Sequence, residues 1–198
     1  MTEIYLLRHG ATEAGAALAG STDLPLAADA TDDLRRTAQA LTAIHFDQIW
    51  SSPLLRCRQT LEIVLPGARA EIVADLREVD FGQWEMRTFA EIIEQYPADM
   101  ARLAAWERDF AFPGGEKMAA FLARCAALRR RVAALDAAGG GEKILLVTHG
   151  GVIRQLLCAW LGNDARNYLN YGVQAGRFTT VSVYGDGGVL TGFNLGRR

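Results

Sequence analysis

The chain has almost no lysine, no charge excess of either sign and no long apolar run. Only Lys117 and Lys143 are lysines among 21 basic residues in a chain of 198, and the formal net charge is −2. A nucleic-acid-binding domain usually carries a basic excess, so we expect no nucleic-acid partner. No charge-free apolar run approaches the ~18 residues of a membrane span, and the N-terminus does not resemble a signal peptide. We therefore expect a cytoplasmic protein without membrane contact.

The motifs of several enzyme classes are also missing. The three cysteines, Cys57, Cys125 and Cys158, form no CxxC pair, and there is no HExxH stretch. Because protein zinc sites usually have such spacings, we expect reduced, buried thiols, no metal and no other cofactor. The GxSxG motif of serine hydrolases and the GxxxxGK[ST] loop of P-loop proteins are absent as well.

Strand and helix patterns alternate along the chain. Short β-favouring runs are found at 3–7, 47–51, 70–74 and 143–148, and helical patterns at 31–44, 53–65, 118–135 and 151–162. Ser52 before Pro53 predicts the N-cap and first turn of the second helix. Near the C-terminus, 178–184 and 189–193 predict an antiparallel hairpin joined at Asp186-Gly187. Strands separated by helices predict a largely parallel sheet with both faces covered.

The stretch 78–114 breaks this alternation. It is rich in aromatic residues, has no strand pattern and is closed by Gly114-Gly115. We interpret it as a mainly helical excursion, approximately residues 84–114, that caps one end of the sheet. The length suits a single domain over residues 1–198.

Two of the three histidines follow matching strand ends. The sequence YLLRHG ends the first strand and LLVTHG ends the strand at 143–148. Ligands of open parallel sheets bind beyond the C-terminal strand ends. We therefore expect His9 and His149 to lie side by side, and His45 to be structural.

Two arginines are expected near these histidines. Arg8 precedes His9, and Arg56 lies in the first turn of a helix that begins at a strand end. Helix N-termini attract anions, and the planar guanidinium pairs with phosphate oxygens two at a time. The sequence thus predicts a positive pocket for a phosphate group beside an imidazole, which suggests phosphoryl transfer to nitrogen.

Four segments resemble the motifs of the histidine phosphatase superfamily, in the phosphoglycerate-mutase-like branch. They are LLRHGATEAG at 6–15, SSPLLRCRQT at 51–60, LREVDFGQWE at 76–85 and VTHGGVIR at 147–154. They occur in the family's order and cover nearly the whole chain. The resemblance implies an α/β fold, a three-layer α/β/α sandwich with a mixed, mostly parallel sheet. It also implies a metal-independent phosphomonoester hydrolase.

The resemblance assigns roles to residues of the four motifs. His9 is expected to be the nucleophile that becomes phosphohistidine, within a phosphate clamp made of Arg8, Arg56, His149 and the backbone of Gly150. Glu78 matches the proton donor and acceptor; Asp80 and Glu85 are nearby carboxylates that do not fall on the family position. Where the family often has a phosphate-binding Asn this chain has Gly15, so we expect Thr12 or a backbone N–H to replace that contact.

The sequences FGQWEMRTF at 81–89 and YGVQAGRFTTVSV at 171–183 further resemble alpha-ribazole phosphatases of cobalamin biosynthesis. The expected substrate is then alpha-ribazole 5′-phosphate, with Trp84, Trp106, Phe110 and Phe112 available either to stack on its base or to anchor the excursion. Three alternatives remain open: a broad-specificity small-molecule phosphatase, a phosphoglycerate mutase, and a phospho-ligand-binding module without catalysis. The only expected partner is a small phosphomonoester, and the chain could be a monomer or a homodimer.

Overall fold

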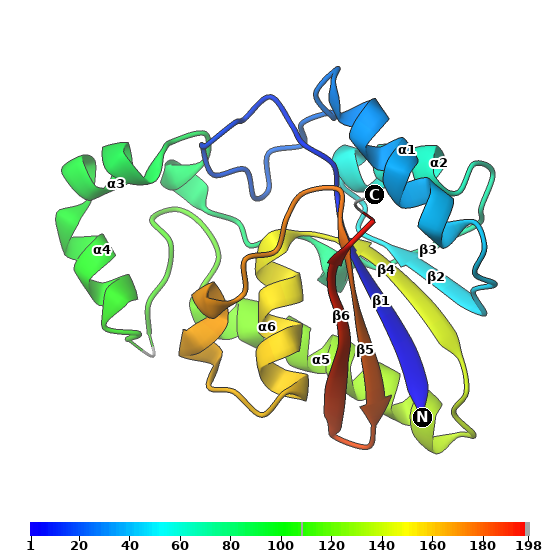
Figure 1. Cartoon of the computed structure of the whole chain (residues 1–198). Helices are drawn as coiled ribbons and strands as arrows, with labels where there is room; N and C mark the ends of the chain where they lie inside the picture. Colours follow the sequence, from blue (N-terminus) through cyan, green and yellow to red (C-terminus); the bar gives the residue numbers. More distant parts are fainter. Residues whose placement is uncertain (108, 197–198) are drawn as a thin grey trace.

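A computed structural model describes residues 1–107 and 109–196 (Figure 1). Within them, six strands form one sheet in the order β3-β2-β4-β1-β5-β6. Strands β1, β4, β2 and β3 are parallel, whereas β5 runs antiparallel to β1 and β6 antiparallel to β5. The expected mixed, mostly parallel sheet is confirmed. The strands are β1 Thr2–Arg8, β2 Gln48–Ser51, β3 Glu71–Ile72, β4 Lys143–Thr148, β5 Phe178–Tyr184 and β6 Gly187–Leu195.

Helices cover both faces of this sheet (Figure 1). On one face, α1 (Ala30–Leu41) and α2 (Leu55–Val64) pack together over one apolar cluster. On the other, α5 (Met118–Ala137) and α6 (Gly150–Trp160) pack over a second cluster. The last five residues of β4 are all buried, because a central parallel strand is apolar on both faces.

Three local predictions were wrong in detail. The strand expected at 70–74 is paired only over Glu71–Ile72. The hairpin turn lies at residues 185–186, so β6 already begins at Gly187. Ser52 is not the N-cap of α2, which begins at Leu55, and the Leu55 N–H donates to the Asp23 carboxylate at 2.6 Å. The anion preference of this helix N-terminus is therefore met by the chain's own carboxylate.

The excursion is mainly helical, as expected, with α3 (Phe89–Gln95) and α4 (Pro97–Ala104) beside the sheet (Figure 1). Thr88 and Glu91 form a capping box at the start of α3, and Pro97 occupies the first turn of α4, where its missing N–H costs nothing. No helix in residues 1–107 and 109–196 is long and apolar enough to cross a membrane.

Candidate active site

The parallel pairing of β1 with β4 brings the two His-Gly turns together. Arg8 pairs with Thr148 in the strand register, and the next residue of each strand is a histidine. The His9 N–H donates to the Thr148 carbonyl at 2.9 Å, and the His9 and His149 ring centroids are 5.0 Å apart. The structure thus places the two imidazoles side by side at the C-terminal edge of the sheet.

The His9 ring is oriented by its own backbone. Its Nδ1 atom lies 2.7 Å from the Gly10 carbonyl oxygen. Burial, and then the positive charges of Arg8 and Arg56, lower the pKa of His9 to about 3. The ring is therefore neutral near pH 7, and a carbonyl neighbour requires the proton on Nδ1. The Nε2 lone pair is left free for attack on an electrophile.

Both ring nitrogens of His149 are engaged by the protein. The Arg56 Nε–H donates to Nδ1 at 3.2 Å, and Nε2 lies 2.8 Å from the Ser52 hydroxyl. Burial holds the pKa of His149 well below its ordinary value, and the neighbouring His9 and Arg56 groups lower it further. The neutral ring accepts from Arg56 at Nδ1, so Nε2 carries the proton and donates to Ser52. Cys57, a free and buried thiol as expected, lies with Sγ 3.5 Å from Nε2.

The fully buried Arg56 side chain is committed to the loop at residues 19–22. Nη1 donates to the Thr22 carbonyl at 2.8 Å, and Nη2 donates to the carbonyls of Ala19 and Gly20 at 3.2 and 2.7 Å. With the bond to His149, four of its contacts are to the protein. A guanidinium has five N–H donors, so this arrangement leaves little of Arg56 for a phosphate.

The same loop is held from its other side by Glu85, a role that sequence reasoning missed. The two Glu85 carboxylate oxygens accept from the backbone N–H groups of Gly20, Ser21 and Thr22 at 3.0–3.3 Å and from the Thr22 hydroxyl at 2.7 Å. Asp80 accepts from the Ser21 hydroxyl at 2.9 Å. These two carboxylates thus build the loop that fixes Arg56, and Glu78 is the motif carboxylate left for chemistry.

Arg8 is the clamp residue with free donors. Its Nη1 donates to the Val173 carbonyl at 2.8 Å, and its buried Nε has no partner among the described residues. Burial lowers the pKa of Arg8; Glu78 opposes this shift, and Arg154 adds to it. An atom added at Gly150 would lie 3.5 Å from the Arg8 Nε and Cζ atoms, which is van der Waals contact, so the guanidinium lies against the start of α6.

Glu78 is docked on the first turn of α6. Its Oε2 accepts from the Gly151 N–H at 2.8 Å, and its Oε1 accepts from the Val79 N–H at 3.1 Å. A side chain at Gly151 would place its Cβ 2.4 Å from Glu78 Oε1, so only a glycine leaves the Glu78 carboxylate in this place. The carboxylate is held beside the helix N-terminus with its outer edge facing a cavity.

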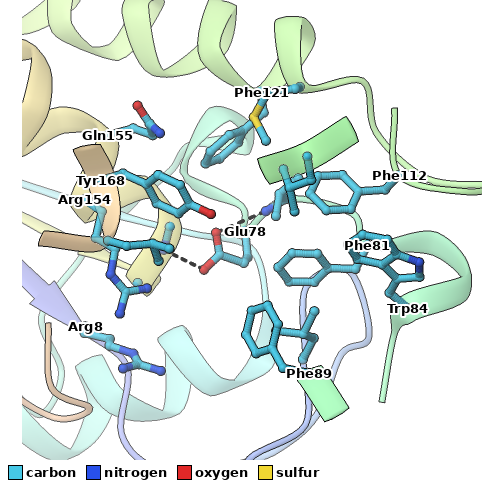
Figure 2. A pocket seen from close by; sticks show the side chains of 17 residues that line it. Arg8, Glu78, Phe81, Trp84, Phe89, Phe112, Phe121, Arg154, Gln155 and Tyr168 are labelled. Atoms are coloured by element: carbon cyan, nitrogen blue, oxygen red, sulfur yellow. Dashed lines mark hydrogen bonds between the residues drawn. The ribbon is translucent and has the colours of Figure 1, made fainter. Parts of the chain in front are cut away.

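This cavity, of about 230 Å³, opens beside Glu78 (Figure 2). Its polar lining comes from Arg8, Glu78, Arg154, Gln155 and Tyr168, together with the glycines at the start of α6. The rest of its wall is apolar, half of it aromatic: Leu18, Val79, Phe81, Trp84, Phe89, Leu103, Phe112, Met118, Phe121 and Leu169. An apolar cavity with a few convergent polar groups is typical of a small-molecule site.

The four aromatic residues singled out from the sequence divide between two positions. Trp84 and Phe112 line the cavity but are also buried, with ring centroids 5.4 Å apart. Phe110 packs against both of them, whereas Trp106 packs against Tyr168 at 5.8 Å. All four anchor the excursion, and the sequence reasoning missed Phe81, Phe89 and Phe121 as cavity residues.

Thr12 and Gly15 lie on the loop that follows His9. Thr12 forms an isolated β-bridge with Leu26, and its hydroxyl makes no hydrogen bond among the described residues. Gly15 is exposed with φ +58°, and an added Cβ would meet nothing within 4 Å. Among the described residues, no hydrogen bond joins Thr12 or Gly15 to the two imidazoles. No group of three or more His, Cys, Asp or Glu residues that could hold a metal is found in residues 1–107 and 109–196.

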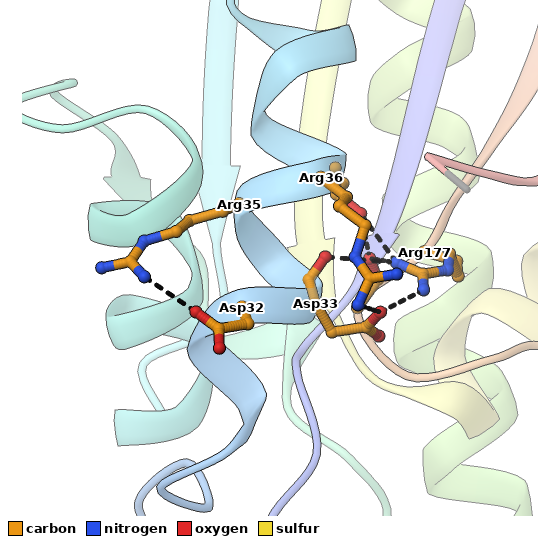
Figure 3. A network of polar contacts seen from close by, with 7 residues as sticks. Asp32, Asp33, Arg35, Arg36 and Arg177 are labelled. Carbon is orange, nitrogen blue, oxygen red and sulfur yellow. Dashed lines mark hydrogen bonds and ion pairs between the residues drawn. The ribbon is translucent and has the colours of Figure 1, made fainter. Parts of the chain in front are cut away.

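The backbone that carries His9 is held by residues at and next to a buried arginine, Arg177, whose pairing with Asp33 is drawn in Figure 3. The Gly176 N–H donates to the His9 carbonyl at 2.9 Å, and the Arg8 N–H donates to the Arg177 carbonyl at 3.0 Å. The Arg177 guanidinium in turn pairs with Asp33 on α1 at 2.5 Å and donates to the Thr37 hydroxyl at 3.1 Å. The backbone of His9 is thus held by Gly176 and Arg177, just before β5, and through Arg177 by α1.

Known proteins match this chain over most of its length. It is 30% identical over 187 residues, covering 91% of this chain and 90% of the relative, to an adenosylcobalamin/alpha-ribazole phosphatase of Salmonella typhimurium. It is 33% identical over 169 residues, covering 83% and 77%, to a probable phosphoglycerate mutase of Proteus mirabilis. The crystal structure of the alpha-ribazole phosphatase from Shigella flexneri has the same fold, with a TM-score of 0.86 at 24% identity over 98% of this chain and 97% of that one.

A family model for the histidine phosphatase superfamily, branch 1, matches residues 4–196. That match spans both His-Gly turns, the Arg56 helix and Glu78. The chain is a phosphatase that belongs to the histidine phosphatase superfamily.

Proposed function

We propose that the protein hydrolyses a phosphomonoester through a phosphohistidine on His9, and that its substrate is alpha-ribazole 5′-phosphate. The observation that carries the mechanism is the state of His9: a neutral ring with Nδ1 turned to the Gly10 carbonyl and Nε2 free, 5.0 Å from the His149 ring. Such a ring is a competent nucleophile.

In the first step, His9 Nε2 attacks phosphorus and the bond from phosphorus to the ester oxygen breaks. The departing oxygen takes the proton from the Glu78 carboxyl group, which faces the cavity where the leaving group lies. In the second step, the Glu78 carboxylate takes a proton from water, and the resulting hydroxide attacks phosphorus. The bond to Nε2 breaks, releasing inorganic phosphate and the neutral imidazole.

Stabilisation of the transferring phosphoryl group comes from fixed positive charge. Arg8 has a buried Nε without a protein partner and lies against the first turn of α6. Arg56 and His149 also face this region but are engaged by the protein. Arg8 and the N-terminus of α6 are therefore the first donors to the phosphate, and Arg56 joins them as it exchanges a loop carbonyl for a phosphate oxygen.

Two facts support the choice of substrate. The leaving-group cavity is walled mainly by aromatic and aliphatic side chains, which favour a flat aromatic group over a small sugar acid with two charges. The Salmonella typhimurium relative is named for activity on adenosylcobalamin and alpha-ribazole phosphates. A phosphoglycerate mutase must retain a charged glycerate during phosphate return, whereas most of the side chains that line this cavity are apolar.

The test is a comparison of kcat/KM for alpha-ribazole 5′-phosphate, ribose 5-phosphate, O-phosphoserine and 3-phosphoglycerate, with mutase turnover assayed under a bisphosphoglycerate primer. We expect alpha-ribazole 5′-phosphate to be preferred by at least tenfold and no mutase turnover. Equal values across the panel indicate a broad-specificity phosphatase, and primer-dependent turnover of phosphoglycerate indicates a mutase; either result refutes the substrate assignment. Loss of all hydrolysis in His9→Ala tests the mechanism separately.

A further inference from the structure

Arg154, on α6, is a second guanidinium at the mouth of the site and plays no part in the mechanism above. It lies four residues after Gly150 on the helix, so both face the same side. An atom added at Gly150 would be 3.2 Å from Arg154 Nη1 and 3.5 Å from Arg8 Cζ. Both guanidinium groups therefore converge over one bare glycine at a helix N-terminus, where each adds to the positive potential.

Arg154 has donors to spare. Its Nε donates to the Tyr171 carbonyl at 2.9 Å, which fixes the plane of the guanidinium. Neither of its terminal nitrogens has a hydrogen-bond partner in the described part of the chain, and no carboxylate there lies within 4.0 Å of Arg154 or Arg8. Arg8 and Arg154 repel each other, Glu78 offsets part of this repulsion at Arg8, and a ligand that supplies acceptor oxygens relieves the rest.

Arg154 lines the leaving-group cavity, which it shares with Arg8. Arg154, Gln155 and Tyr168 line the leaving-group cavity, whereas Arg56 and His149 do not. Figure 2 shows the Arg154 guanidinium on the same side of the cavity as Arg8, next to Glu78. Glu78 protonates the ester oxygen in the proposed mechanism, so a donor beside it on the cavity side reaches atoms of the leaving group close to that oxygen.

We propose that Arg154 is a specificity-determining residue that donates to hydroxyl or carboxylate oxygens on the leaving group, within a few bonds of the ester oxygen. The inference rests on the proposed function. On this proposal the cavity has two parts. A polar part, made by Arg154 with Gln155 and Tyr168, recognises a sugar-like segment of the leaving group. An aromatic part binds an apolar ring. A leaving group with no oxygen near the ester uses only the aromatic part.

The test uses two phosphomonoesters that differ in the leaving group: ribose 5-phosphate, which carries hydroxyls near the ester oxygen, and phenyl phosphate, which carries none. Arg154→Met removes the donors and retains an unbranched apolar side chain. We expect kcat/KM for ribose 5-phosphate to fall by about 10- to 100-fold, the range for loss of hydrogen bonds from a charged donor. For phenyl phosphate we expect a change of less than threefold.

Arg35→Met is the matched control. Arg35 lies on α1, on the opposite face of the sheet, has a 69% exposed side chain and, among the residues that the structure describes, pairs only with Asp32; its loss should leave both rates within twofold of wild type. Arg154→Lys keeps the charge but loses the planar fork, so it should show a partial loss on ribose 5-phosphate only. It provides the same comparison if thermal melting shows that Arg154→Met does not fold.

Three results overturn the inference. Equal losses on both substrates assign Arg154 to the phosphoryl group, and no loss on either removes it from substrate recognition. A wild-type enzyme that hydrolyses phenyl phosphate but not ribose 5-phosphate also contradicts a role of Arg154 in recognising hydroxyl groups. Failure of the proposed function looks different: the wild type then hydrolyses neither ester, or His9→Ala retains wild-type hydrolysis of phenyl phosphate.

Discussion

Replacement of Glu85 by Gln tests how the site is built. The carboxylate accepts from three consecutive backbone N–H groups, those of Gly20, Ser21 and Thr22, at 3.0–3.3 Å. A glutamine amide offers one acceptor oxygen and turns an NH₂ group toward donors, so about two N–H groups lose their acceptor. Each such loss costs about 1–3 kcal/mol. Because the loop is partly solvated we expect the low end, about 2–4 kcal/mol in total.

For a domain of this size a loss of 1 kcal/mol lowers Tm by about 2–4 °C, so Glu85→Gln should melt roughly 4–16 °C below wild type. The carbonyls of the same loop hold Arg56, so kcat on phenyl phosphate should also fall, by about tenfold or more, as the cation loses its fixed position. Glu94→Gln, on the exposed face of α3, should change stability by less than about 0.5 kcal/mol. A Glu85→Gln protein with wild-type melting and wild-type kcat refutes this account of the loop.

Three further predictions concern other parts of the site. Gly151→Ala should lower kcat by at least about tenfold with little change in Tm, because the new Cβ meets only the flexible end of Glu78, at 2.4 Å; unchanged kcat contradicts the docking of that carboxylate. Asp33→Asn should lower Tm by several degrees because it removes the counter-charge of the buried Arg177; calorimetry against wild type checks this. His9 has a folded pKa of about 3 against 6.5 when unfolded, so the unfolded chain binds the extra proton; the stability due to neutral His9 is present above pH 6.5 and is lost as pH falls toward 3. Urea unfolding across that range should show a shallower decline for His9→Gln, and parallel curves contradict the shift.

The meeting of His9 and His149 could be predicted because it depends only on sheet geometry. Each histidine follows an apolar strand, and parallel neighbours end at the same edge. The pairing of β1 with β4 then makes the contact. Sheet geometry does not predict the position of Glu78, because residues 76–80 have no periodic pattern that fixes the direction of the chain. Glu78 was predicted near the site only through its motif.

The partners of the charged groups could not be predicted from the sequence. Arg56 was expected to face a phosphate, but its donors are turned to carbonyls of residues 19–22. The N-terminus of α2 was expected to attract a ligand anion, and it is capped by Asp23, 32 residues earlier in the chain. Such contacts between distant loops leave no local pattern, because neither hydrophobic periodicity nor capping preference records which loop packs where.

The roles of Asp80 and Glu85 could not be predicted from the sequence either. Both are carboxylates close to Glu78 in sequence, and composition alone does not distinguish them. The different positions of Glu85 and Glu78 depend on the 3-10 turn at Gly82–Trp84. This turn directs Glu85 toward the backbone of residues 20–22, whereas Glu78 contacts the first turn of α6. The Gly20 position supports this packing, since a Cβ there would lie 1.9 Å from the Val79 carbonyl oxygen.

The central claim is that His9 Nε2 captures the phosphoryl group, and mass spectrometry tests it most directly. Turnover of a good phosphomonoester is quenched rapidly into alkaline denaturant, which preserves the phosphorus–nitrogen bond, and the peptides are mapped. We predict an added phosphoryl group on His9, absent from His9→Ala and retained in a His45→Ala control. An adduct on another side chain, or undiminished hydrolysis by His9→Ala, contradicts the account.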